Sequence, residues 1–271
     1  MKLFGKALAC VLSASMTGIS SAFGQTDSDV ISKIVKIQGP EGKPGTGFVL
    51  GPDKRRRCLL LTAKHTMFNW VEYEENFKIY FSNGEFRSVN PKIFIFPSDP
   101  KLDLAAAPVP CNGMEISAPL AKSSAISITT PVKVFGYPSY NHSNESYSGR
   151  GDMIEGIVTK YSASGNDAKN KGYNISYSAK TFTGFSGGPV FSSDLSELIA
   201  VHGYTFSVQP DPNNEKTDRQ IDLDLLSEDE QREYLRVGGS GISASKVYRF
   251  LRDHGYIMKR SKKAACLVGV C

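Results

Sequence analysis

Short hydrophobic segments alternate with polar turns through most of the chain. The segments are residues 30–38, 46–50, 58–63, 77–81, 93–96, 132–136, 153–161 and 198–204. They are rich in Val, Ile, Phe and Tyr and are separated by Gly, Pro, Asn and Ser, which is typical of strands and turns. Amphipathic helical patterns are scarce in the same region. The pattern therefore predicts an all-β fold built as a sandwich or as barrels.

Two turn signals organise this region. Asn83 and Gly84 lie between two strand-like segments, and Asn-Gly indicates a hairpin because both residues tolerate positive φ. Residues 111–131 contain Pro119 and Pro131 and show little periodicity. We expect this second stretch to link two halves of the fold.

The character of the chain changes after residue 205. Residues 209–224 are polar and predict a surface loop, and Ser227 with Glu230 has the spacing of a capping box for a short charged helix. Ser243 is a candidate N-cap for a C-terminal helix. That helix would end near Gly255 and carry Val247, Phe250 and Leu251 on one face.

Composition sets the size and class of the protein. The chain has 271 residues and a mass of 29.6 kDa, enough for one large or two small domains with their own cores. With 40% hydrophobic and 22% charged residues, it has the composition of a folded globular protein. The 32 basic and 27 acidic residues are mixed along the chain without a long basic stripe, so nucleic acid is not an expected partner.

The N-terminus has the features of an export signal. Lys2 and Lys6 precede a mostly apolar or small stretch at residues 7–19, and Ala22 to Gly24 form a small-x-small cleavage site. The alternative is a membrane anchor, but serine and threonine interrupt the apolar stretch, which is shorter than the roughly 20 residues a span requires. We expect residues 1–24 to be a cleaved signal peptide, with no stable membrane anchor, and the mature protein to be secreted or periplasmic. Its net charge would be +5 − 2 = +3, because the two lysines leave with the signal.

Export also bears on the cysteines. Cys10 would leave with the signal peptide, and the four that remain are Cys58, Cys111, Cys266 and Cys271. An even number in an oxidising compartment indicates two disulfides, for which three connectivities are open. We favour Cys58 with Cys111, beside apolar strand-like segments, and Cys266 with Cys271 in the tail. No close Cys-x-x-Cys or Cys/His pair is present, so no metal site is expected.

The segment at residues 184–189, Gly-Phe-Ser-Gly-Gly-Pro, is the most informative for chemistry. Flanking glycines allow a tight turn that exposes Ser186 and admits a substrate backbone. The same turn can direct the backbone N–H groups of Gly184 and Ser186 toward a developing oxyanion. A purely structural glycine-rich turn is the alternative for this segment taken alone.

Two upstream residues complete a nucleophilic arrangement. His65 ends one strand-like segment, and Asp103 precedes another. A histidine can take the proton of the Ser186 hydroxyl and return it to a leaving group, while an aspartate fixes the imidazole tautomer. Each residue alone is usually structural. Their joint order along the chain favours chemistry.

On these residues the sequence resembles the trypsin/chymotrypsin-like serine peptidases. The matching segments are residues 46–49 (Thr-Gly-Phe-Val), 62–65 (Thr-Ala-Lys-His), 103–105 (Asp-Leu-Ala) and 184–189. The resemblance implies two packed six-stranded antiparallel β-barrels, with a catalytic triad of His65, Asp103 and Ser186 between them. The expected division is an N-terminal barrel at residues 25–115, a C-terminal barrel at residues 116–206, and a polar loop, helix and tail at residues 207–271. No cofactor or metal is implied.

Two departures point to a subfamily. Lys64 precedes the histidine, as is usual in bacterial glutamyl endopeptidases, which this chain resembles more than animal digestive enzymes. Phe185 stands where zymogens of the trypsin type carry an aspartate that pairs with a new N-terminus, so activation by that ion pair is not available. Thr181 and His202 resemble the threonine and histidine of the glutamyl pocket, where they would bind a substrate carboxylate.

Two other functions compete with this one. The Gly-x-Ser-x-Gly pattern also fits the nucleophile elbow of an α/β-hydrolase esterase, with His254 and Asp222 or Asp224 completing the triad. A peptidase fold acting only as a binding module is the other alternative, although no triad member is missing. The sequence favours an exported serine endopeptidase that cleaves proteins or peptides through an acyl-enzyme, with acidic residues as candidate cleavage sites. A protein inhibitor is a further candidate partner.

Overall fold

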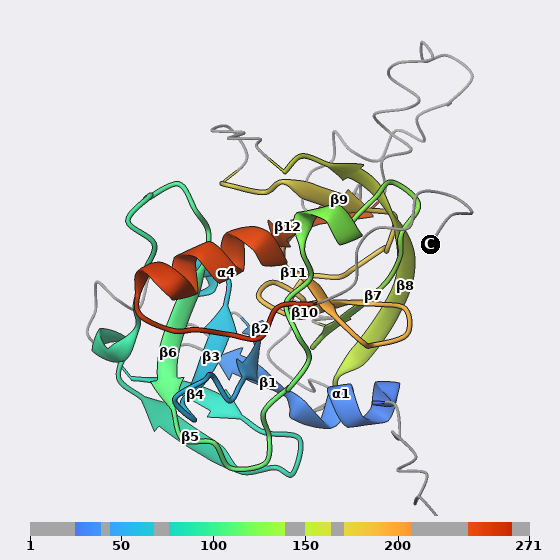
Figure 1. Cartoon of the computed structure of the whole chain (residues 1–271). Coiled ribbons are helices and arrows are strands. Elements are labelled where there is room, and N and C mark those ends of the chain that lie inside the picture. The colour runs from blue at the N-terminus through green and yellow to red at the C-terminus, as the bar shows by residue number, and fades with distance from the viewer. Residues whose placement is uncertain are drawn as a thin grey trace, which may run out of the picture.

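The computed structural model describes residues 25–38, 44–67, 76–138, 150–163, 171–206 and 238–261. Two six-stranded antiparallel sheets make up the fold (Figure 1). The predicted signal peptide, the charged helix after Ser227 and the Cys266–Cys271 pair lie outside the described residues. Within the residues that the structure describes, no helix is long and apolar enough to cross a membrane.

The first sheet is a half-barrel. Its strands are β1 (Ile34–Gln38), β2 (Pro44–Leu50), β3 (Cys58–Thr62), β4 (Phe77–Tyr80), β5 (Phe86–Val89) and β6 (Ala105–Val109), in the order β5-β4-β1-β2-β3-β6. The hairpin predicted at Asn83 and Gly84 is confirmed, because β4 and β5 pair on either side of it and Gly84 has φ +84°. Residues 91–93 form a 3-10 turn and only Ile95 makes a bridge, so the strand expected at 93–96 is wrong.

The second sheet closes into a barrel. Its strands are β7 (Pro131–Gly136), β8 (Asp152–Tyr161), β9 (Ile175–Tyr177), β10 (Pro189–Ser192), β11 (Leu198–Phe206) and β12 (Gly238–Ser243), in the order β10-β11-β12-β9-β8-β7. The barrel therefore extends past the expected boundary at residue 206. Strand β12 has the sequence Gly-Gly-Ser-Gly-Ile-Ser, which lacks the alternating apolar side chains that reveal a strand, yet it joins β9 to β11.

Two helices pack on the closed barrel, one from each end of the described chain. Helix α1 (Asp27–Lys33) comes before the first sheet but packs on β7 and β8, where Lys133 pairs with Asp27 at 2.8 Å. The capping box of Thr26 and Asp29 starts this helix, so the strand expected from residue 30 begins four residues late, at Ile34. After the second barrel, α4 (Ala244–Asp253) packs on β11 and β12. The segment that follows α4 reaches the first half, where the Lys54 backbone N–H donates to the Ile257 carbonyl at 3.2 Å. Helix α4 begins after Ser243, as predicted, although no side-chain capping bond forms there.

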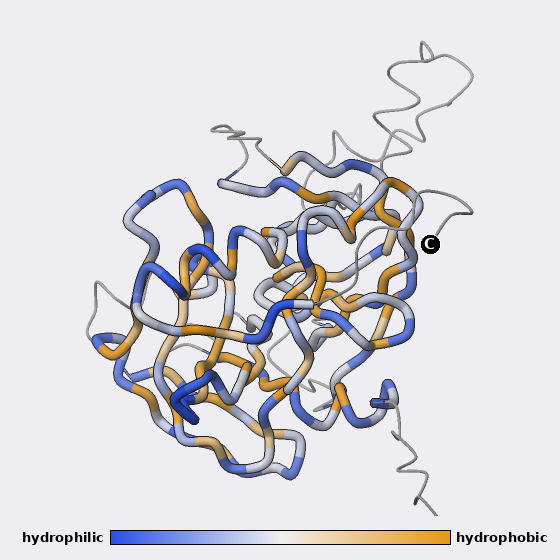
Figure 2. Tube along the Cα trace, viewed as in Figure 1, coloured by the Kyte–Doolittle hydropathy of each residue, from blue (hydrophilic) through white to orange (hydrophobic). Residues whose placement is uncertain are grey.

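Hydrophobic side chains fill both faces of the first sheet. On β3, Leu59 and Leu61 join the large core shared with the second barrel, whereas Cys58 and Leu60 face a smaller core within the first sheet. This alternation follows from the two-residue period of a strand. Figure 2 shows the resulting pattern, with hydrophobic positions along the strands and hydrophilic ones at the outer turns.

The linker between the halves follows both sheets. The N–H of Ile116 donates to the Val49 carbonyl in β2 at 2.7 Å, and that of Ala121 donates to the Leu198 carbonyl in β11 at 2.9 Å.

The antiparallel pairing throughout both sheets excludes the α/β-hydrolase alternative, which requires parallel strands. His254 lies at the end of α4, with its ring nitrogen 2.9 Å from the Phe250 carbonyl.

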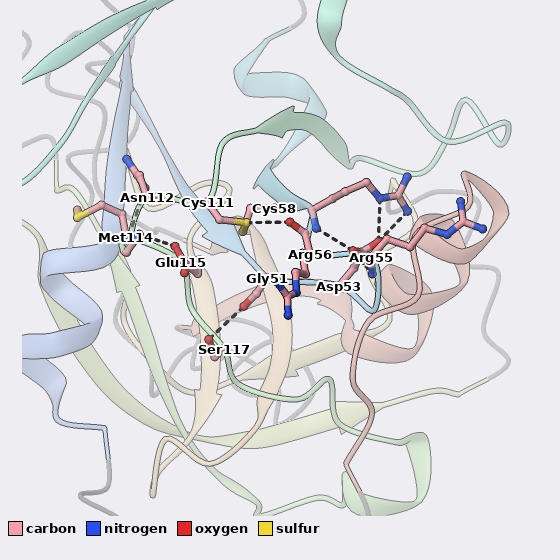
Figure 3. Close-up of a disulfide and its surroundings, with 12 residues drawn as sticks. Gly51, Asp53, Arg55, Arg56, Cys58, Cys111, Asn112, Met114, Glu115 and Ser117 are labelled. Carbon is pink, nitrogen blue, oxygen red and sulfur yellow. Dashed lines mark hydrogen bonds and ion pairs between the residues drawn. A yellow bond between two sulfur atoms is a disulfide. The ribbon is translucent and has the colours of Figure 1, made fainter.

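A disulfide joins the first residue of β3 to the segment just after β6, at one end of this strand pair. Cys58 and Cys111 are bonded, as favoured from the sequence, and Figure 3 shows the bond beside the loop at residues 51–57. Asp53 orders that loop by accepting hydrogen bonds from the backbone N–H groups of Arg55 and Arg57, at 2.8 and 2.9 Å.

Removing this disulfide is expected to destabilise the fold. The bond closes a loop with a sequence separation of 53 residues. Chain-entropy arguments for a loop of that length give about 4 kcal/mol of stability. Urea unfolding of the Cys58→Ala/Cys111→Ala variant checks this. An unchanged free energy of unfolding, with both cysteines accessible to a thiol reagent in the unreduced wild type, would contradict the pairing.

Candidate active site

Pairing of β3 with β6 brings His65 and Asp103 together. Thr62 at the end of β3 lies opposite Ala105 at the start of β6, so the residues just beyond these two positions share one edge of the sheet. His65 lies there in a short 3-10 turn, and Asp103 lies in the segment that leads into β6. The local fold thus follows directly from the register of two hydrophobic strands.

The Asp103 carboxylate holds His65 through both of its oxygens. Oδ2 lies 2.6 Å from the His65 ring atom Nδ1, and Oδ1 accepts from the His65 backbone N–H at 2.7 Å. Tyr173 donates a short hydrogen bond to Oδ2 as well. Burial raises the pKa of Asp103, but the hydrogen bonds and charge of His65, with the Tyr173 hydroxyl, outweigh it and lower the pKa below its ordinary value. Asp103 therefore stays ionised at neutral pH.

The loop that carries Ser186 is held by the first sheet. Thr46 of β2 donates its backbone N–H to the Ser186 carbonyl at 2.8 Å and its hydroxyl to the Gly184 carbonyl at 2.6 Å. Gly187 has φ +89°, and a Cβ there would lie 2.1 Å from the Thr46 carbonyl oxygen. Glycine is thus required at this position by both conformation and space. Phe185, at the position where zymogens of the trypsin type carry an aspartate, is buried in the hydrophobic core.

Within the described residues, the Ser186 hydroxyl has one hydrogen-bond partner, the Gly203 carbonyl at 3.3 Å. The structure thus brings His65 and Asp103 into direct contact but shows no bond between His65 and Ser186. Among the same residues, the backbone N–H groups of Gly184 and Ser186 have no acceptor. They are therefore free to donate to a ligand atom.

Thr181 and His202, the two predicted pocket residues, also come together. Thr181 Oγ1 lies 3.3 Å from the His202 ring atom Nε2, and both residues are buried. Thr205 adds a second hydroxyl 3.2 Å from the same nitrogen, and Tyr177 places its hydroxyl on Nδ1. The result is a polar group of two hydroxyls around one edge of a buried imidazole.

His202 has polar neighbours at both ring nitrogens. Burial raises the pKa of Tyr177 well above its ordinary value, so its hydroxyl keeps its proton at neutral pH and can either donate to Nδ1 or accept from it. In the tautomer in which Nδ1 accepts from Tyr177, Nε2 carries the proton that faces Thr181 and Thr205. Burial, with a smaller contribution from the charge of His65, lowers the pKa of His202 from 6.5 to about 3. The imidazole is neutral at neutral pH.

Sequence reasoning missed Thr46, Tyr173, Tyr177 and Thr205. Thr205 lies three residues after His202, which in a regular strand places the two side chains on opposite faces. A bulge in β11 between His202 and Tyr204 shifts the register and returns Thr205 to the side of His202. Nothing in the local pattern signals that bulge. Thr46 was within a quoted motif, but its contacts are with residues about 140 positions away.

No group of three or more His, Cys, Asp or Glu side chains that could hold a metal ion occurs in the described parts of the chain.

The low pKa of His202 predicts that acid destabilises the fold. Between pH 6.5 and about 3 the unfolded chain binds a proton at residue 202 that the folded chain does not, so the free energy of unfolding falls as pH falls. The His202→Gln variant has no imidazole at this position, so neither its folded nor its unfolded form takes up this proton. The stability advantage of wild type over His202→Gln should therefore shrink by about 2 kcal/mol from pH 6.5 to 4.5. Urea unfolding at both pH values measures it, and equal differences at the two pH values would refute the assignment.

Comparison with known proteins supports the fold and the family. A family model described as a trypsin-like peptidase domain matches residues 45–201. No protein of curated function matches the chain significantly. Among solved structures, the serine endoprotease from Yersinia pestis is similar, with a TM-score of 0.53 and 16% sequence identity, covering 88% of this chain and 73% of that one.

The family model is evidence for the family of the chain, whereas the solved structure is evidence for its fold. At 16% identity the structural likeness shows the fold alone. The family model matches more than half of the chain, from β2 to the middle of β11, and includes His65, Asp103 and Ser186. The chain therefore belongs to the trypsin-like peptidase family.

Proposed function

We propose that this protein is an exported serine endopeptidase in which Ser186 is the nucleophile, His65 the general acid and base, and Asp103 the group that orients His65. One observation carries the proposal. Asp103 uses both carboxylate oxygens to fix His65 on the first sheet, while Thr46 of the same sheet holds the backbone of the Ser186 loop. The first sheet thus positions Asp103, His65 and the loop that carries Ser186 relative to one another.

The proposed reaction uses no cofactor. The Ser186 hydroxyl leaves the Gly203 carbonyl, gives its proton to Nε2 of His65, and its oxygen attacks the carbonyl carbon of the peptide bond. The free N–H groups of Gly184 and Ser186 stabilise the oxyanion. His65 then gives the proton to the leaving amine as the C–N bond breaks. Water, deprotonated by His65, hydrolyses the acyl-enzyme, and Ser186 regains its proton.

The pocket around His202 supports a preference for acidic residues before the cleaved bond. In the tautomer with the proton on Nε2, His202 can donate to a substrate carboxylate together with the hydroxyls of Thr181 and Thr205. Such charge-assisted hydrogen bonds are stronger than neutral ones. Lys180 is exposed and would add only a screened positive charge.

Export of the protein is supported by two features of the chain. Residues 1–24 have the pattern of a signal peptide, and Cys58 is bonded to Cys111, as is common in oxidising compartments. We propose that the mature enzyme acts outside the cytoplasm on protein or peptide substrates.

Replacing Ser186 with alanine is expected to abolish turnover. Removal of the nucleophile of a triad lowers kcat by about a million-fold, which here means loss to the detection limit. Hydrolysis of a fluorogenic peptide library measures this. Ser193→Ala, an exposed serine in a turn of the same barrel, is the matched control and should retain wild-type activity. Activity in a clean Ser186→Ala preparation would overturn the assignment, and an inactive folded wild type would favour a binding module.

Thr181→Val is expected to weaken cleavage after glutamate. The substitution keeps the shape of the side chain but removes a hydroxyl next to His202, so kcat/KM for a glutamate substrate should fall about tenfold. A matched substrate with glutamine at the same position carries no charge and should lose much less. Equal losses for the two substrates, or a wild type without preference for glutamate, would exclude the acidic pocket.

A further inference from the structure

The segment before β9 reaches across the boundary between the halves to Asp103. The Tyr173 hydroxyl donates to Asp103 Oδ2, and the Asp103 backbone N–H donates to the Lys171 carbonyl at 3.1 Å. Asp103 lies just before β6 of the first sheet, whereas residues 171–174 lead into β9 of the closed barrel. The orienting carboxylate is therefore held from both halves of the molecule.

The Tyr173 hydroxyl keeps its proton and so can always donate to Asp103. Its pKa is raised far above its ordinary value, first by burial and then by the charge of Asp103, so its hydroxyl is never ionised under working conditions. Oδ2 of Asp103 receives this hydroxyl together with the His65 ring, while Oδ1 receives the His65 backbone N–H. Without Tyr173, Oδ2 would have only the His65 imidazole as a partner.

The chain makes room for Tyr173 at Gly203. A Cβ at Gly203 would lie 2.2 Å from Tyr173 Cε1 and 2.6 Å from Cζ, closer than any side chain can approach. Gly203 has no positive φ, so space and not conformation requires glycine here. The Gly203 carbonyl is also the acceptor of the Ser186 hydroxyl. The tyrosine ring thus packs against the backbone that holds the candidate nucleophile while its hydroxyl holds the acid.

We propose that Tyr173 is a positioning residue of the active site, which fixes the Asp103 carboxylate for His65, and that Gly203 is required to admit its ring. The inference rests on the proposed function and deepens it. Tyr173 does not touch the reacting atoms. It acts through Asp103, and its effect on turnover follows from the orientation of His65.

Tyr173→Phe tests the hydroxyl alone. The ring and its packing remain, but Asp103 Oδ2 loses its second donor, so kcat should fall about tenfold while KM stays within twofold of wild type. Tyr161→Phe is the matched control, because the buried Tyr161 hydroxyl has no hydrogen-bond partner among the described residues and its removal should leave kcat unchanged. A Tyr173→Phe enzyme with wild-type kcat, or with a changed KM only, would overturn the proposal.

A double-mutant cycle tests the requirement for glycine. Gly203→Ala should displace the ring and lower kcat at least as much as Tyr173→Phe does. In the Tyr173→Ala background the space is empty, so Gly203→Ala should cost less than twofold further. Additive losses would show that Gly203 is needed for another reason.

A spectroscopic measurement separates this inference from the proposed function. The proton between His65 Nδ1 and Asp103 gives a low-field NMR resonance that needs no substrate, assigned by its loss in Asp103→Asn. In Tyr173→Phe it should broaden through faster exchange with water, and in Tyr161→Phe it should not. If wild type proves inactive but this contrast holds, the proposed function fails and the positioning role stands. If wild type is active and the resonance is unaffected, the positioning role fails alone.

Discussion

The buried carboxylate of Asp103 is the constraint that organises this site. An ionised carboxylate that is only 5% exposed loses its hydration and must be compensated by donors of fixed geometry. Three such donors surround it: the ring and backbone of His65, and the hydroxyl of Tyr173. Since Tyr173 comes from the second half of the chain, the charge is satisfied only when the two sheets are in place. Folding and assembly of the site are thereby coupled.

Other contacts make the same junction rigid. The hydroxyl of Thr46 in β2 donates to Gly184 and accepts from the backbone N–H of Tyr137, joining the Ser186 loop to β7. Helix α1, which precedes the first sheet, packs on the closed barrel, and the segment after α4 bonds to the loop after β2. The halves are therefore interlocked, and their shared core continues from Phe48 to Phe191. Such a junction can hold candidate site residues from the two halves at fixed positions through noncovalent contacts alone.

Local sequence patterns predicted much of this architecture because hydrophobic alternation and glycine-rich turns act over a few residues. The strands around His65, the β4–β5 hairpin and the pairing of Cys58 with Cys111 follow from such patterns. Strand β12 was missed because its glycines carry no side chains to alternate, and its place is decided by the neighbours β9 and β11. In α1, a capping box outweighed the apolar residues that favoured a strand.

The parts of the site that escaped prediction are those made by distant contacts. Tyr173 meets Asp103 across 70 positions of sequence, and no pattern near either residue encodes that distance. Thr205 depends on a bulge that changes which face of β11 it occupies. By contrast, the proximity of Thr181 and His202 was expected, because a family resemblance supplied the long-range information that local patterns lack.

Covalent labelling of the folded mature protein with a fluorophosphonate probe asks whether Ser186 is an activated nucleophile. The probe should modify Ser186, identified by mass spectrometry of the labelled peptide, and His65→Ala should slow the labelling sharply. Labelling at another serine, or none in a protein shown to be folded, would contradict the assignment of Ser186.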